Sequence, residues 1–170
     1  MNIGFYAPLK SPDSAIPSGD REMAKLLYRS LQNQGHEVKL VSRFKSREPE
    51  GLEERQKQLQ LQGEQVSKEL IQEFSTIENW RPDLWFTYHM FYKAPDLIGP
   101  KVSAALKIPY VVAEASHSPK RARGRWSLFH EEVEKTIAHA DLIIGMNTND
   151  HAAIKQIIND NTRYEELRPF

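Results

Sequence analysis

The chain has 170 residues, of which 39% are hydrophobic, so it is long enough for one domain with a sizeable core. Its 23 basic residues balance 23 acidic ones, unlike a typical nucleic-acid binder, and the absence of cysteine excludes disulfides, thiol chemistry and thiolate metal sites. No apolar run approaches the roughly 18 residues of a membrane span, and no basic leader is visible, so we expect a cytoplasmic protein.

The first part of the chain is predicted to form a strand, a loop, a helix and a second strand. An apolar run over residues 2–8 predicts the first strand, Ser18 and Gly19 open the helix, and Gly35 ends it. Residues 36–42 resume as a strand, which makes a parallel crossover unit. Such a unit places free N–H groups of the helix beside the end of the first strand, where phosphate can bind.

Residues 52–77 carry an apolar stripe that predicts a long amphipathic crossover helix lying on the sheet. Gly63 is a weak point in this helix, because glycine costs about 1 kcal/mol relative to alanine in a helix interior. A coiled-coil partner helix is the alternative interpretation, but too few heptads support it.

The rest of the chain alternates short apolar runs with helical patterns. The expected strands cover residues 84–88, 110–113, 142–146 and 164–167, and the expected helices cover residues 95–106, 127–139 and 148–158. Pro95 suits a first-turn position, and Thr148 is the expected cap of the last helix. The near-continuous apolar strands indicate burial on both faces. We therefore predict one domain over residues 1–170 with a doubly wound, Rossmann-like α/β fold: a mainly parallel sheet of about six strands, with helices on both faces.

Polar side chains follow several of the predicted strands. In an open parallel sheet, ligands bind outside the carboxyl ends of the strands. Asp83 and Asp141 precede strands, at the opposite edge, and we interpret them as turn or capping residues. The candidates at the productive edge are Ser18, Gly19, His89, Glu114, Ser116, His117 and residues 147–149.

Two of these candidates offer acid–base chemistry. Because imidazole titrates near neutral pH, His117 could accept a proton or bind a hydroxyl group, and Glu114 could polarise it. His89 stands among aromatic residues, a setting that suits a sugar or a ring. We expect Gly19, His89 and His117 to meet on one rim of the sheet. Each candidate also has an ordinary structural alternative. Gly19 could be part of a plain helix start, His89 a partly buried histidine with a hydrogen bond, and His117 and Glu114 a loop histidine and a solvated glutamate.

A basic loop follows the fourth strand. Its cations are Lys120, Arg121, Arg123 and Arg125, with Trp126 after them. Such a loop could clamp a phosphate or an anionic acceptor, contact anionic lipid headgroups at a membrane surface, or simply be solvated. Nucleic acid is disfavoured by the neutral charge of the whole chain.

Residues 130–134 read His-Glu-Glu-Val-Glu, which partly matches the H-E-x-x-H zinc motif. Glu134 stands where that motif has its second histidine, so we expect no metal site on this helix.

Four segments resemble the N-terminal domain of GT-B glycosyltransferases, especially the large retaining family 4. They are the glycine loop and helix start at residues 18–22 with the "GHEV" strand at 35–38, the "RPD" segment at 81–83 with His89, the strand at 108–112, and the "ADLII" strand at 140–144. Together these segments span nearly the whole chain.

The resemblance implies transfer of a sugar from a nucleotide-diphosphate sugar to an acceptor hydroxyl, without a metal or another cofactor. It makes His117 or Glu114 the catalytic group. The substrate-binding residues that it implies are Gly19, Ser18, His89, Ser116, Lys120, Arg121 and Arg123. In this family a C-terminal domain binds most of the donor, so we expect this chain to be the acceptor-side half and to be inactive alone.

Two alternatives stay open from the sequence. One is a non-catalytic α/β module that binds a nucleotide or a sugar, and the other is half of a GT-B-type nucleotide-sugar epimerase. Tight nucleotide binding by the chain alone would favour the binding module.

Overall fold

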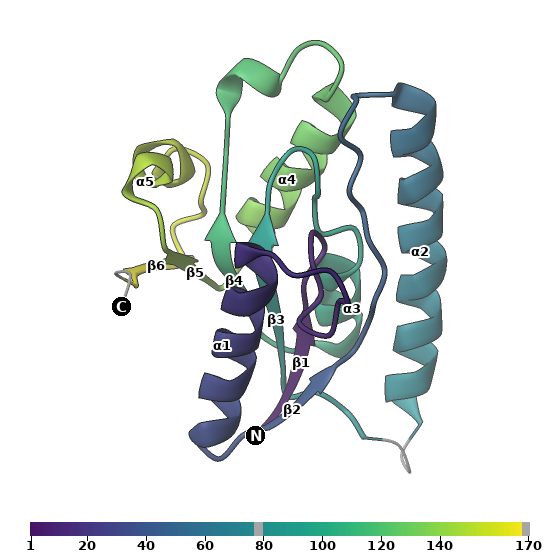
Figure 1. Ribbon diagram of the computed structural model, residues 1–170, viewed down its shortest axis with the longest axis vertical. Coiled ribbons are helices and arrows are strands. Elements are labelled where there is room, and N and C mark those ends of the chain that lie inside the picture. Colours follow the sequence, from purple (N-terminus) through teal and green to yellow (C-terminus); the bar gives the residue numbers. More distant parts are fainter. Residues whose placement is uncertain (77–79, 168–170) are drawn as a thin grey trace.

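The computed structural model describes residues 1–76 and 80–167. The strands are β1 (Asn2–Tyr6), β2 (Glu37–Leu40), β3 (Leu84–Met90), β4 (Tyr110–Ala115), β5 (Leu142–Gly145) and β6 (Arg163–Glu166). The α-helices are α1 (Gly19–Asn33), α2 (Glu53–Ser75), α3 (Gly99–Leu106), α4 (Ser127–His139) and α5 (Thr148–Lys155), with a 3₁₀ turn at Pro119–Arg121. The predicted α/β fold is confirmed (Figure 1).

The strands form a single parallel sheet with the order β2-β1-β3-β4-β5-β6. From β1 the chain first steps outward to β2 and then returns to the other side of β1, where β3 to β6 follow in sequence. The direction of winding therefore reverses between β1 and β3. A reversal of this kind opens a crevice at the carboxyl ends of the two strands, where ligands of such sheets bind.

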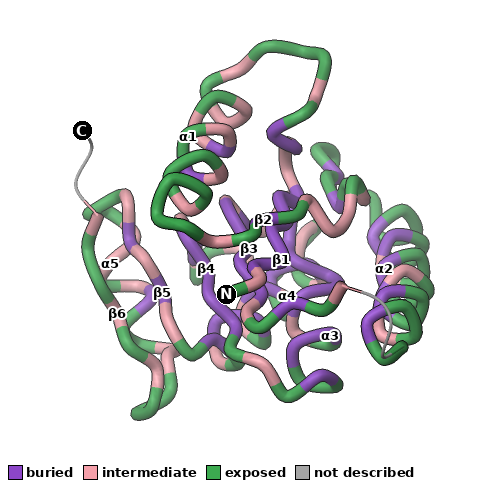
Figure 2. The backbone as a smooth tube through the Cα atoms, turned by 90° about the horizontal axis from the view of Figure 1, so that it is seen from below, coloured by how far each residue is buried: buried purple, intermediate pink, exposed green. Residues whose placement is uncertain are grey.

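Helices cover both faces of the sheet, as expected. The helix α1 packs on one face through Ala24 and Leu27, against side chains such as Phe5 and Phe86. The helices α2 to α5 contribute to the core on the other face, which includes Trp85. Figure 2 shows the buried strands between α1 on one side and α3 and α4 on the other.

The helix α1 begins and ends where the sequence predicts. The hydroxyl of Ser18 accepts a hydrogen bond from the N–H of Arg21 at 3.2 Å, and its carbonyl accepts one from Glu22 at 3.1 Å. Gly35 follows the helix with a φ of 83°, a conformation that glycine adopts without strain. Local capping chemistry therefore fixes this element.

Gly63 has a packing role in α2. It is buried, and a Cβ atom at this position would lie 2.7 Å from the Cβ atom of Leu97 and 3.2 Å from its carbonyl oxygen. The glycine therefore lets α2 approach the segment that precedes α3. The expected helix end at Ile77 lies outside the described residues.

The expected start of α3 at Pro95 is wrong. The helix begins at Gly99, because the carboxylate of Asp96 accepts hydrogen bonds from the N–H groups of Ile98 (2.9 Å) and Gly99 (2.7 Å) and holds the preceding turn. Pro100 occupies the first turn instead.

The cap of α5 also differs by one residue from the prediction. The side chain of Asn147 accepts a hydrogen bond from the N–H of Asn149 at 3.0 Å, so Asn147 is the cap and Thr148 is the first helical residue. Within the described residues, no helix has the length and apolar character that crossing a membrane requires.

Candidate functional site

A cavity of about 590 Å³ opens beside the carboxyl ends of β1 and β2. It is lined by Leu9, Lys10, Ile16, Ser18, Asp20, Lys45, Arg47 and Arg55. These residues come from the loop after β1, the start of α1, the segment after β2 and the first turn of α2. Four of the eight carry a positive charge and one carries a negative charge, so we call this space the cationic cavity.

The first turn of α1 adds backbone donors to the cationic cavity. Ser18 satisfies the N–H groups of Arg21 and Glu22, which leaves those of Gly19 and Asp20 without an acceptor in the described part of the chain. A Cβ atom at Gly19 would meet nothing within 4 Å, so the site is open above this residue. Free N–H groups, the positive end of the helix dipole and four cations together suit an anion.

His89 lies beside this helix start. Its Nδ1 atom is 2.8 Å from the carboxylate of Asp20, and its side chain is 20% exposed. The φ of His89 is 55°, in the left-handed region that a histidine seldom adopts. The ring packs near Tyr88 and Phe91, with centroids at 5.7 and 5.4 Å. His89 therefore lies near the end of β3, as expected, on a polar rim with aromatic neighbours.

Glu114 has the same backbone conformation on the adjacent strand, with a φ of 58°. The pairing of Tyr88 with Ala113 makes His89 and Glu114 neighbours across β3 and β4. Burial is the main cause that raises the pKa of Tyr88 well above its ordinary value, and the nearby Glu114 carboxylate, which also hydrogen-bonds to the tyrosine, raises it further. Asp20, Tyr88, His89 and Glu114 thus form one edge cluster.

The two left-handed residues reverse the alternation of side chains along both strands. Val111 and Ala113 pack on the α1 face, and simple alternation would place Ala115 there too. Ala115 packs instead in the core on the opposite face, and so does Met90 after His89. The last residue of each strand therefore points to the face opposite the one that alternation predicts.

The predicted meeting of His117 with Gly19 is not observed. The Nε2 atom of His117 lies 3.0 Å from the carboxylate of Glu134 on α4, and only 4% of the histidine side chain is exposed. Within residues 1–76 and 80–167 no hydrogen bond or ion pair joins His117 to Gly19 or Glu114. The reversal at Glu114 explains this, because it directs His117 away from the α1 face. Ser116 makes a different contact: its hydroxyl donates a hydrogen bond to the carboxylate of Asp150 at 2.7 Å.

The basic loop, residues 120–126, is partly ordered by aromatic rings. The guanidinium of Arg121 lies 4.8 Å from the ring of Tyr92 and 5.1 Å from that of Trp126, and the ammonium of Lys93 lies 4.9 Å from Trp126. Cation–π contacts of this kind fix Arg121. The remaining cations of the loop are exposed: Lys120, Arg123 and Arg125.

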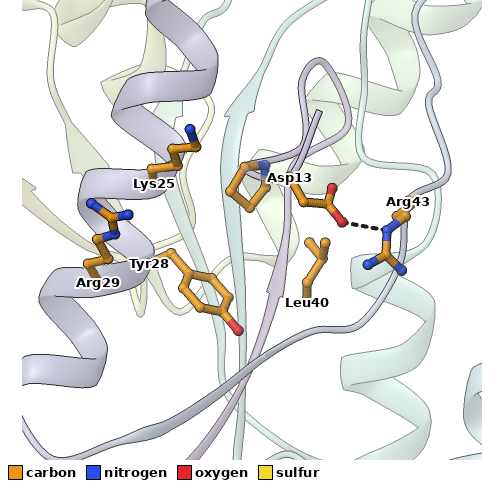
Figure 3. A pocket seen from close by; sticks show the side chains of 7 residues that line it. Asp13, Lys25, Tyr28, Arg29, Leu40 and Arg43 are labelled. Atoms are coloured by element: carbon orange, nitrogen blue, oxygen red, sulfur yellow. Dashed lines mark hydrogen bonds and ion pairs between the residues drawn. The ribbon is translucent and has the colours of Figure 1, made fainter. Parts of the chain in front are cut away.

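A second cavity, of about 310 Å³, lies between α1 and β2 (Figure 3). Several of its polar groups are already paired, since Arg43 lies 2.6 Å from Asp13, Lys25 lies 3.4 Å from Glu22 and the Tyr28 hydroxyl donates to the carbonyl of Val38. A hydrogen bond from Ser11, followed by the contacts with Arg43, lowers the pKa of Asp13. This cavity therefore offers fewer free groups to a ligand than the cationic cavity.

The sequence reasoning missed most of the cationic cavity. Lys45 and Arg47 follow β2, and Lys10 follows β1, so the rule that ligands bind at carboxyl ends of strands could have found them. Arg55 gives no such signal, because it reaches the cavity from the first turn of α2. A comparison with models of known protein families and one with curated proteins each find no match for this chain. Its function must therefore be argued from the chemistry of the site.

Proposed function

We propose that this chain is the acceptor-side half of a cytoplasmic glycosyltransferase that uses a nucleotide-diphosphate sugar. The observation that carries the proposal is the cationic cavity at the start of α1, beside the carboxyl ends of β1 and β2, the edge at which ligands of such sheets bind. Its charge and free N–H groups suit the diphosphate of such a donor. The resemblance to the N-terminal domain of GT-B enzymes supports the same assignment.

The cavity and the edge cluster have different roles in this proposal. Lys10, Lys45, Arg47 and Arg55 neutralise the phosphates, while the N–H groups of Gly19 and Asp20 donate to phosphate oxygens. The edge cluster offers His89 and Glu114 to hydroxyl groups of the sugar and the acceptor. His117 belongs neither to the cationic cavity nor to the edge cluster, so we assign contact with the substrate to His89 and Glu114 instead.

Sugar transfer explains why cations are needed here. The acceptor oxygen bonds to the anomeric carbon, and the bond from that carbon to the phosphate oxygen breaks. The phosphate oxygen takes the electron pair, and the acceptor proton leaves to a nearby base such as the Glu114 carboxylate. Fixed positive charge stabilises the negative charge that develops on the leaving diphosphate. In this proposal the basic loop holds an anionic acceptor or contacts anionic lipid headgroups.

A titration with inorganic pyrophosphate tests the binding step. In amide NMR spectra of the chain we expect shifts at Gly19 and Asp20, and a Kd about tenfold weaker after Lys45→Gln with Arg47→Gln. The control Arg29→Gln removes a cation that lies along α1, away from the cationic cavity, and should leave the Kd within about twofold. Shifts that avoid the start of α1 would contradict the proposed site.

A transfer assay distinguishes the proposal from its rivals. Joined to a donor-binding domain, the chain should transfer sugar to an acceptor, and alone it should show negligible turnover. Tight nucleotide-sugar binding by the chain alone, without transfer in the joined protein, would favour the non-catalytic module. Interconversion of the sugar without an acceptor would favour the epimerase.

A further inference from the structure

Three ligand-type side chains meet between β4 and α4, apart from the edge cluster. They are His117 from the segment after β4, and His130 and Glu134 from α4. One ligand atom from each residue can be chosen so that all of them lie within 4.8 Å of one another. Both histidines are buried, whereas the Glu134 side chain is 43% exposed.

The spacing matches a small metal ion. The Nε2 atom of His117 lies 3.0 Å from one carboxylate oxygen of Glu134, and the Nδ1 atom of His130 lies 3.8 Å from the other. Ligand atoms about 2.0 to 2.1 Å from a tetrahedral Zn²⁺ stand about 3.4 Å apart. The two observed distances bracket this separation, so a cation could enter with small side-chain movements.

The scaffold around these residues is already built. His130 and Glu134 are four residues apart on one helix, so they share a face. The start of α4 is held by Gln56 of α2, whose amide accepts from the N–H of Phe129 at 3.2 Å and donates to the carbonyl of Arg125 at 2.6 Å. A rigid helix start keeps two of the three ligands in place without metal.

The hydrogen bonding of the two histidines is incomplete. Among the described residues, the Nδ1 atom of His117 and the Nε2 atom of His130 are buried and have no partner. Buried polar atoms without partners are costly, and native proteins rarely keep them without a role. The two rings lie 5.0 Å apart between their centroids, so they pack against each other. The ring nitrogens that face Glu134 are therefore the ones that a cation would meet, while the opposite nitrogen of each ring has no partner among the described residues.

We propose that His117, His130 and Glu134 bind one divalent cation, with Zn²⁺ as the best match for two imidazoles and a carboxylate. Metals of this class prefer such ligands, and three protein ligands leave a fourth position open. The bound ion ties the segment after β4 to α4 and so orders the entry to the basic loop. The H-E-x-x-H comparison missed this site because the third ligand comes from another part of the chain.

Titration of the chain with ZnCl₂ by calorimetry, and with Co²⁺ by visible absorption, tests the site. We expect one equivalent to bind, with Co²⁺ bands that show nitrogen and oxygen ligands. Glu134→Gln should weaken binding by at least about tenfold, because it removes a charged ligand. The matched control Glu131→Gln changes an exposed residue of the same helix and should leave binding within about twofold.

Two further measurements keep the test decisive. Zn²⁺ should raise the melting temperature of the wild type and of Glu131→Gln but not of Glu134→Gln, whose folding is checked by circular dichroism. His151→Gln removes a histidine of α5, which is not part of the cluster, and should retain the site. Absence of stoichiometric binding, or its loss in either control variant, would overturn the proposal.

Discussion

The Nδ1 atom of His89 lies 2.8 Å from the Oδ1 atom of Asp20, although 69 residues separate them in the chain. The contact joins the carboxyl end of β3 to the first turn of α1, across the crevice at which the sheet reverses its winding. It therefore fixes the position of the edge cluster relative to the free N–H groups of the helix.

The pair should show measurable coupling in a double-mutant cycle of His89→Ala and Asp20→Asn. Because both side chains are partly exposed, we expect an interaction free energy of about 0.5 to 1 kcal/mol in urea unfolding at low salt. Glu22→Asn is the matched control, since Glu22 is paired with Arg21 and Lys25 instead. The changes in the free energy of unfolding caused by Glu22→Asn and by His89→Ala should simply add. Equal coupling in both cycles would contradict the specific pairing of His89 with Asp20.

Replacement of Gly63 by alanine should destabilise the protein, although alanine is the better helix former. The added methyl group would lie 2.7 Å from Leu97, and overpacking of this kind costs about 1 to 3 kcal/mol. Thermal and urea unfolding measure the effect. In the background Leu97→Ala the same change should be less harmful, because the obstructing side chain is gone. A stabilised Gly63→Ala protein would show that α2 is free to move away.

Asp96 should make stability depend on pH. Burial raises the pKa of this carboxyl above its ordinary value of about 3.9, even though Thr87, Tyr110 and two backbone N–H groups donate to it. A carboxyl with a raised folded-state pKa stabilises the fold most below its unfolded-state pKa, and loses this contribution as the pH rises through the folded-state pKa.

Comparison with Asp96→Asn isolates this contribution, because asparagine does not titrate. The free energy of unfolding of the wild type, relative to the variant, should fall as the pH rises above about 4. Urea unfolding between pH 4 and neutrality, at matched ionic strength, measures the difference. A difference that stays constant or grows with pH would show that the donors outweigh burial and lower the pKa instead.

Lys107→Gly should stabilise the protein by about 1 kcal/mol, because it relieves left-handed strain after α3. Lys107 is exposed, has a φ of 55° and forms the C-cap of the helix. Lys101→Gly, an exposed position inside the same helix, should instead destabilise by about 1 kcal/mol. Melting temperatures of the two variants check the opposite signs, and a loss of stability in both would contradict the argument.

The sequence alone determined the strands, most helices and the parallel character of the sheet. These follow from local signals, such as the cap at Ser18, the glycine at position 35 and the apolar runs of β3 to β5, which act over a few residues. It also placed Gly19 and His89 at the carboxyl edge of the sheet, because that edge is fixed once the order of strands and helices is known. The start of α3 was misplaced because the buried carboxylate of Asp96 holds the turn before the helix, which the pattern of apolar residues does not reveal.

Only the tertiary structure decided which side chains meet. The left-handed backbone at Glu114 reverses the alternation that the sequence suggests, and so turns His117 from the α1 face toward Glu134. The cations of the cavity come from three separate segments, and the cluster on α4 gains its third ligand from the segment after β4. Periodicity describes the neighbourhood of each residue along the chain, whereas charge and ligand geometry arise between residues that only folding brings together.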